Sequence, residues 1–249
     1  MRLASFDLEI ASELINPTSA ENLGISCAAL ALSEGLVEDN PVLFWYDYPR
    51  LSQERCQRLV EDLQYYDNLG YKIVTWNGCG FDFKVLAYES QMFPECAELA
   101  LNHIDMMLLV TFVKGHYLGL DKALRGAGLE GKTHEIRLKD GSILTEMNGA
   151  LAPQLWANQE IDAVLEYLKG DVTQPLLLAQ HIEQTEEIRW LSSSNRQSVV
   201  FTPNLFTVRE CFDLPKPDIS WMLNYPVREN FISWMPEEVL DKYGLKIVV

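Results

Sequence analysis

Long apolar runs are missing from the sequence, and none approaches the roughly 20 residues that a membrane-spanning helix needs. No secretory signal is visible either, because Met1 and Arg2 lead into a strand-like segment that carries two acids. The five cysteines lie far apart and form no Cys-x-x-Cys pair. This pattern disfavours a disulfide framework and a cysteine-rich zinc site. We therefore expect a cytoplasmic protein that does not enter a membrane.

Basic residues are also scarce, with 20 Lys and Arg against 36 Asp and Glu and a net charge of −16. General affinity for phosphate comes from Lys and Arg, so this charge argues against non-specific binding of nucleic acid. It is compatible with an enzyme whose acids hold cations and whose contact with nucleic acid is local. The four histidines show no metal-ligand spacing, and no Gly-x-x-x-x-Gly-Lys loop is present.

The chain has 249 residues, of which 48% are hydrophobic, so a sizeable core is possible. Apolar patterns predict strands near residues 2–9, 24–32, 42–46, 71–76 and 104. Helical patterns follow near residues 52–70, 81–89, 94–102 and 106–114. Asp140-Gly141 indicates a hairpin within residues 136–144. Residues 158–184 predict one long helix or two abutting helices, with a kink near Gln174 before Pro175.

Three strands in a row, followed by alternating helices and strands, indicate an α/β fold. We expect a mixed five-stranded sheet flanked by helices over residues 1–186. From residue 187 onward the chain turns to prolines and polar loops, with 8 acidic and 7 basic residues. We expect residues 187–249 to form a C-terminal extension packed on the core, because Trp190, Trp221 and Trp234 need burial.

Asp7 and Glu9 form the first candidate pair. Residues two apart in a strand point to the same side, so both carboxylates project together near the end of the first strand. Close carboxylates repel each other and are costly to bury unpaired, and a hard divalent cation is their natural partner. Taken alone, the pair is explained as well by a solvated strand end.

The second candidate follows the fourth strand, where Asn77 leads through a Gly-x-Gly turn to Phe81 and Asp82. Gly78 and Gly80 permit a tight turn and a close approach of the backbone to a ligand. Asp82 falls in the first turn of the next helix, where its charge also favours the helix dipole. Helix stabilisation alone is a sufficient explanation of this aspartate in isolation.

The third candidate is Tyr167 with Asp171. Positions four apart on a helix share a face, so a phenol and a carboxylate are presented side by side. An amphipathic helix with a tyrosine at the boundary of the core also explains the pair when it is taken alone.

Together the motifs read acid-x-acid, then Asn-x-x-x-Phe-Asp, then Tyr-x-x-x-Asp. This set resembles the tyrosine branch of the DEDD exonuclease superfamily, which includes proofreading 3′→5′ exonuclease domains of DNA polymerases and ribonuclease D. The chain is similar to predicted exonucleases related to the exonuclease domain of family B polymerases, with weaker matches at residues 103–106, 128–132 and 167–172. The resemblance covers residues 1–188.

The resemblance implies a ribonuclease H-like fold and a metal-dependent 3′→5′ exonuclease that releases nucleoside monophosphates. By family analogy, Asp7, Glu9 and Asp171 hold one Mg²⁺ or Mn²⁺, and Asp7 bridges to a second ion near Asp82. Two such ions activate water and stabilise the leaving 3′ oxygen. Tyr167 would orient that water, because a phenol with a pKa of about 10 is a poor base at neutral pH.

The substrate expected from the resemblance is a single-stranded 3′ end. Glu9 would contact the terminal 3′-hydroxyl, and Asn77 would either contact the substrate or brace its turn. Phe81 offers an aromatic surface for a base. Arg189 and Arg196 lie in the most basic stretch of the extension, and we expect them to contact the substrate strand.

Two alternatives stay open at this point. One is an exoribonuclease on the same scaffold, since no residue convincingly reads a 2′-hydroxyl, although the likeness to proofreading domains slightly favours DNA. The other is a nuclease-like module that binds nucleic acid or protein without cleaving it. The presence of all four acids and the tyrosine disfavours the second alternative.

Overall fold

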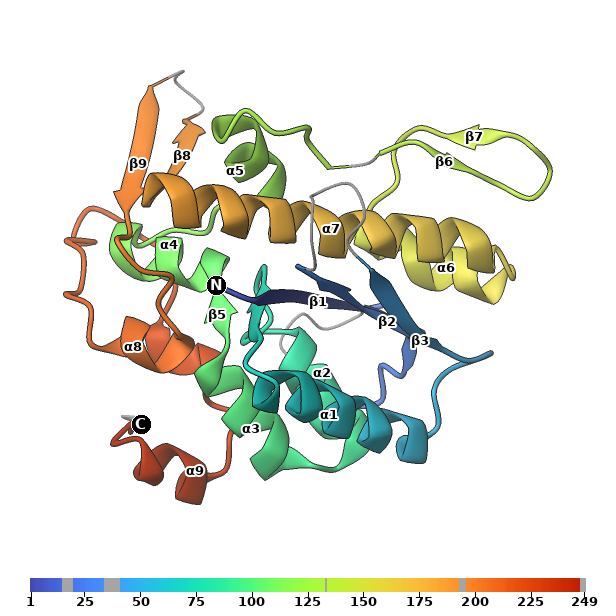
Figure 1. The fold of residues 1–249 in the computed structure, drawn as a ribbon, viewed down its shortest axis with the longest axis horizontal. Coiled ribbons are helices and arrows are strands. Elements are labelled where there is room, and N and C mark those ends of the chain that lie inside the picture. The colour runs from blue at the N-terminus through green and yellow to red at the C-terminus, as the bar shows by residue number, and fades with distance from the viewer. Residues whose placement is uncertain (15–19, 34–40, 133, 193–195, 247–249) are drawn as a thin grey trace.

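A mixed five-stranded sheet lies at the centre of the protein, with helices on both of its faces (Figure 1). The computed structural model describes residues 1–14, 20–33, 41–132, 134–192 and 196–246. The strand order is β3-β2-β1-β4-β5, in which β1 to β3 are antiparallel and β4 and β5 add in parallel. The predicted α/β class with a mixed sheet is confirmed. The strands are β1 (Leu3–Ile10), β2 (Ile25–Leu32), β3 (Val42–Tyr46), β4 (Lys72–Thr75) and β5 (Ile104–Asp105).

Both faces of the sheet are covered. Every residue of β2 is buried, and in β1 Asp7 alone is not fully buried. This pattern is typical of strands enclosed between two layers of helices. Helix α7 crosses β1 and β2 on one face, and α1, α2 and α3 cover the other (Figure 1). The helices are α1 (Gln53–Asn68), α2 (Asp82–Ser90), α3 (Phe93–Asn102), α4 (Met106–Lys114), α5 (Leu120–Gly126), α6 (Ala152–Ala157), α7 (Ile161–Thr185), α8 (Val208–Phe212) and α9 (Glu237–Lys242).

The longer helices follow from local sequence signals. In α1, the Ser52 side chain accepts a hydrogen bond from the Arg55 N–H, and the helix buries Leu59 and Leu63. Helix α7 runs through Pro175 as a single helix (Figure 1). One long helix, rather than two, is therefore the correct reading of residues 158–184. No helix within the described ranges is long and apolar enough to cross a membrane.

Several short elements were not predicted, because each spans too few residues for a periodic pattern to appear. The hairpin around Asp140-Gly141 is confirmed as β6 and β7. A second hairpin, β8 with β9, begins the extension and was not anticipated. The unpredicted helices are α5, α6, α8 and α9. The bounds of the hairpin strands are β6 (Ile136–Arg137), β7 (Ile143–Leu144), β8 (Glu187–Leu191) and β9 (Gln197–Phe201).

The extension lies along the α3, α4 and α5 side of the core. Strand β8 contacts α5, α8 contacts α3 and α4, and α9 contacts α3. Trp190 and Trp234 are buried, but Trp221 is 72% exposed. The expectation that all three tryptophans need burial is thus wrong for Trp221. It lies in an irregular segment between α8 and the 3₁₀ helix Arg228–Phe231.

Candidate active site

Strand β1 carries the first pair of acids in the middle of the sheet, between β2 and β4. Asp7 and Glu9 lie opposite Ala29 and Cys27 of β2. These small neighbours leave space above the sheet, and both acids line a hollow of about 490 Å³. The two carboxylates thus project to the same side of the strand, as their spacing predicts.

The turn after β4 is held by a glycine and by Asp105. A Cβ at Gly78 would lie 2.4 Å from Thr75 Oγ1, so a side chain there would force the turn open. The buried Asp105 carboxylate accepts hydrogen bonds from the N–H groups of Asn77, at 3.0 Å, and Cys79, at 3.1 Å. Asp105 therefore braces the turn through backbone donors and does not line the hollow that holds the other acids.

Asp82 links the helix after this turn to β1. It is the first residue of α2 and is 3% exposed. Its Oδ1 accepts a hydrogen bond of 3.2 Å from the Leu8 N–H, between Asp7 and Glu9. Its carboxyl group also shares a side-chain hydrogen bond with Asp7. The start of α2 thereby places a third carboxyl directly beside the first.

Helix α7 supplies the tyrosine and the last acid. Tyr167 and Asp171 are four residues apart and line the same hollow as Asp7. Because α7 crosses β1, this face of the helix meets the acids of the strand. One ligand oxygen from each of Asp7, Glu9 and Asp171 lies within 4.8 Å of the others. Asp82 joins this cage of three carboxylates through Asp7.

Lys132 is a member of the site that the sequence interpretation missed. Its Nζ lies 2.9 Å from the Asp171 carboxylate and donates a hydrogen bond of 3.0 Å to the Tyr167 hydroxyl. It comes from the irregular segment after α5, so no periodic pattern predicts where it points. The one available signal was the Gly-x-x-Gly-Lys run at residues 128–132.

The carboxyls in the hollow are difficult to ionise together. Burial raises the pKa of Asp7 well above its ordinary range, and repulsion from Asp82, Asp171 and Glu9 raises it further. Burial and Asp171 likewise raise the pKa of Glu9. Lys132 lowers the pKa of both groups but supplies a single positive charge. The hollow therefore holds more potential negative charge than its own residues neutralise.

Asp82 has a pKa raised to about 7, chiefly by burial and against the lowering effect of the Leu8 N–H. In an unfolded chain an aspartate ionises at about pH 3.9. In the metal-free protein, folded Asp82 keeps its proton over a range in which the unfolded chain has lost it. Its contribution to the free energy of unfolding therefore falls as the pH rises from about 4 to about 7.

We expect Asp82→Asn to stabilise the metal-free protein, and to do so more at about pH 8 than at about pH 5. Asparagine keeps an oxygen for the Leu8 N–H and has no charge to bury, so the gain at the higher pH is on the order of 2 kcal/mol. Thermal unfolding in EDTA at both pH values measures it. A gain that did not depend on pH would contradict the raised pKa. Asp162→Asn, at the exposed start of α7, is the control.

The donor set of the cage suits a hard divalent cation. The ligand atoms of Asp7, Glu9 and Asp171 are carboxylate oxygens, which Mg²⁺ and Mn²⁺ prefer over softer metals. The raised pKa values of Asp7 and Glu9 show that the hollow favours a gain of positive charge. A divalent cation provides that charge without protonating the ligands.

The predicted substrate residues fall into two groups. Asn77 and Phe81 line the hollow beside the acids, together with Trp76. Arg189 lies on β8 and pairs with Glu187, and Arg196 precedes β9; neither lines the hollow. Their hairpin, β8 with β9, follows the C-terminal end of α7, whereas Asp171 lies nearer the other end of that helix (Figure 1). Residues 193–195 lie outside the described ranges. Substrate contact by these two arginines stays a prediction that the geometry of the hollow does not support.

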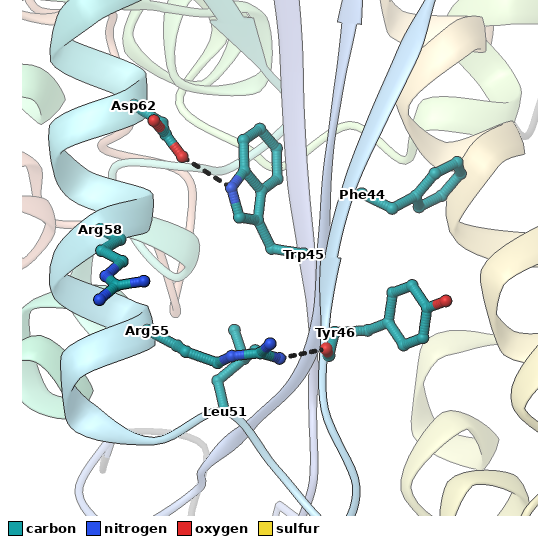
Figure 2. Close-up of a pocket in the computed structure, with 7 residues that line it drawn as sticks. All are labelled: Phe44, Trp45, Tyr46, Leu51, Arg55, Arg58 and Asp62. Carbon is teal, nitrogen blue, oxygen red and sulfur yellow. Dashed lines mark hydrogen bonds between the residues drawn. The ribbon is translucent and has the colours of Figure 1, made fainter.

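A separate hollow of about 510 Å³ lies at the edge of the sheet, between β3 and α1 (Figure 2). Its polar groups bind one another: the Trp45 indole N–H donates to Asp62 at 2.8 Å, and Arg55 donates to the Tyr46 carbonyl at 2.9 Å. Arg58 pairs with Glu54 outside the hollow. Because these charges are already paired, this edge offers no catalytic group comparable with the acid cage.

Comparison of the chain with models of protein families, with curated proteins and with solved structures gave no match.

Proposed function

We propose that the chain is a metal-dependent 3′→5′ exonuclease with a ribonuclease H-like fold, of the tyrosine branch of the DEDD superfamily. The observation that carries the proposal is the cage of Asp7, Glu9 and Asp171, within 4.8 Å of one another, with Asp82 and Tyr167 in the same hollow. A solvated strand end or an ordinary amphipathic helix explains each motif alone. Neither explains why all of these residues meet in one place.

The four acids have distinct places in this proposal. Asp7, Glu9 and Asp171 would hold one Mg²⁺ or Mn²⁺, and Asp7 with Asp82 would hold a second. When bound, the two cations supply an activated water and charge to stabilise the leaving 3′ oxygen. The sheet and α7 hold the carboxyls close together before any cation arrives, so little reorganisation is needed when one binds.

Tyr167 acts as a hydrogen-bond donor at neutral pH. Burial and the neighbouring Asp171 raise the pKa of its phenol, so the hydroxyl keeps its proton. A protonated phenol is a poor base, but it can orient an attacking oxygen or a phosphate oxygen. The Tyr167 oxygen accepts a hydrogen bond from Lys132, and the hydroxyl also shares a hydrogen bond with the Asp171 carboxylate, so its proton is directed toward that acid.

Lys132 would bind the substrate phosphate next to the cage. Among the described residues that line the hollow, it is the one basic side chain. A phosphodiester is an anion, and an ammonium group in a partly buried site stabilises the additional negative charge that develops during its hydrolysis. Trp76 and Phe81 line the same hollow and present aromatic surfaces on which a terminal base can stack.

We expect the protein to shorten a 5′-labelled single-stranded oligonucleotide one nucleotide at a time in Mg²⁺ or Mn²⁺, and to release nucleoside 5′-monophosphates. EDTA should abolish the reaction, since the carboxylates alone cannot activate water. Denaturing gels and chromatography of the products measure this, with DNA and RNA of the same sequence in parallel. Faster cleavage of RNA would make the enzyme an exoribonuclease. Binding without cleavage of either strand would contradict the proposal.

A further inference from the structure

The C-terminal extension contacts the turn after β4, which carries Asn77, Phe81 and Asp82. The Trp234 indole N–H donates a hydrogen bond of 3.1 Å to the Cys79 carbonyl, and the Cys79 thiol donates one of 3.5 Å to the Phe231 carbonyl. A Cβ at Gly80 would lie 3.2 Å from the Phe231 ring, so the ring packs closely against the turn. The extension thus lies against residues 77–82, next to the acids.

Arg228 fixes this part of the extension in place. It is 8% exposed, and its guanidinium donates to the carbonyls of Leu214, Phe112 and Pro215 at 2.7, 2.8 and 2.9 Å. Three hydrogen bonds donated by one buried guanidinium make a rigid connection between α4 and the segment before Phe231. The position of Phe231 beside the turn is therefore determined by the fold.

Asp7, Glu9 and the other acids of the site line one hollow, the acid hollow. Next to it, and distinct from the hollow beside β3, a second hollow of about 530 Å³ lies between the turn and the extension. Asn77 and Phe81 line both this hollow and the acid hollow, so the two spaces adjoin. Its other walls include Lys84 of α2, Tyr117 after α4, and Asn230 of the extension. Both volumes lie in the range of about 300–1,000 Å³ that is usual for ligand sites.

The lining of this second hollow differs in charge from that of the first. The acid hollow has five acidic residues, whereas none of the described residues that line the second hollow is acidic, and Lys84 supplies a positive charge. Tyr117 is 60% exposed, and its ring lies 6.2 Å from that of Phe231. An exposed ring beside a cation and an amide is the combination that binds bases and phosphates of single strands.

We propose that this second hollow is the subsite for the nucleotides upstream of the scissile bond, and that the C-terminal extension builds one of its walls. The inference rests on the proposed function and adds the route of the substrate strand. The terminal nucleotide occupies the acid hollow, the strand passes Asn77 and Phe81, and a preceding base stacks on Tyr117. Lys84 faces the phosphates, and Asn230 contacts the strand.

The test compares a substrate that reaches the subsite with one that is too short to do so. The short substrate is the p-nitrophenyl ester of thymidine 5′-monophosphate, and the long one is the tetranucleotide (dT)₄. In Tyr117→Ala and in Asn230→Ala, we expect the ratio of kcat/KM for (dT)₄ to kcat/KM for the ester to fall, by roughly tenfold for the loss of a base stack on Tyr117. Tyr65→Ala, a tyrosine on α1 that is 59% exposed and lines neither hollow, should keep the wild-type ratio.

Equal losses on both substrates, or no loss on either, would overturn the subsite. A wild-type protein that hydrolyses neither substrate would instead count against the proposed function. In that case fluorescence anisotropy of labelled (dT)₄ in Ca²⁺ decides on the subsite alone. Weaker binding by Tyr117→Ala than by Tyr65→Ala supports it, whereas equal binding by the two variants, or no binding by the wild type, rejects it.

Discussion

Asp7→Asn is expected to reduce hydrolysis of single-stranded DNA on the order of 10³-fold or more, as removal of one main source of transition-state stabilisation does in other enzymes. Asp7 belongs to both proposed cation sites, because it lies in the cage with Glu9 and Asp171 and shares a hydrogen bond with Asp82. Asparagine has nearly the same shape but no charge, so it weakens the binding of both proposed cations.

The same substitution has an opposite effect on stability in the absence of metal. Burial and three neighbouring acids raise the pKa of Asp7, so a neutral side chain at this position should raise the melting temperature of the EDTA-treated protein. In the wild type, Mn²⁺ should raise the melting temperature, since a ligand that binds only the folded state stabilises it. In Asp7→Asn that increase should be much smaller.

Activity assays and thermal unfolding of the same preparations measure both effects. Asp162→Asn serves as the matched control, because Asp162 is an exposed aspartate on α7 that does not line the hollow. Equal hydrolysis by the wild type and Asp7→Asn would show that the activity arises elsewhere. A melting temperature that responds equally to Mn²⁺ in both proteins would remove Asp7 from the cation site.

Lys132→Met is expected to lower kcat by roughly 10²-fold, the effect of losing one electrostatic contact with the reacting phosphate. Methionine keeps much of the length and apolar character of the lysine stem but has no charge. The wild-type ammonium lies 2.9 Å from the Asp171 carboxylate and the Lys132 side chain is 25% exposed, so the field of this charge in the hollow is only partly screened by solvent.

Loss of Lys132 should also destabilise the metal-free protein, by roughly 2 kcal/mol at about pH 8, somewhat less than for a fully buried ion pair. Lys132 lowers the pKa values of Asp7, Glu9 and Asp171. Without it, these carboxyls repel one another more strongly when ionised. The loss should therefore be smaller at about pH 5, where more of them are protonated.

Steady-state kinetics and urea unfolding with and without Mn²⁺ check this prediction. Added Mn²⁺ should restore stability to Lys132→Met without restoring kcat, because a cation neutralises the acids but does not replace the contact with phosphate. Lys122→Met, on the exposed face of α5, is the control. Unchanged kcat in Lys132→Met would restrict this lysine to balancing charge in the metal-free protein.

The acid-bearing elements were predictable because each depends on a short local pattern. Asp7 and Glu9 follow from alternation in a strand, and Tyr167 and Asp171 from the spacing of a helical face. Asp82 follows from a glycine turn that opens a helix. Such patterns give the direction of a side chain within its own element, and the order of strands and helices then brings the elements together.

Lys132 and the second hollow were not predictable in this way. Lys132 lies in an irregular segment, so its contact with Asp171 is set by how α5 and α7 pack. Phe231 and Asn230 lie in a 3₁₀ helix of four residues, and their place beside Asn77 depends on hydrogen bonds distant in sequence. The exposure of Trp221 was mispredicted for the same reason, because composition does not show which surface a short segment meets.

The cage takes two of its acids from β1, which comes early in the sequence, and the third from α7, which comes much later. During synthesis, a nascent polypeptide has the strand long before it has the helix. The cage, and with it any cation site built from these three acids, therefore cannot form before α7 has been synthesised and has packed on β1.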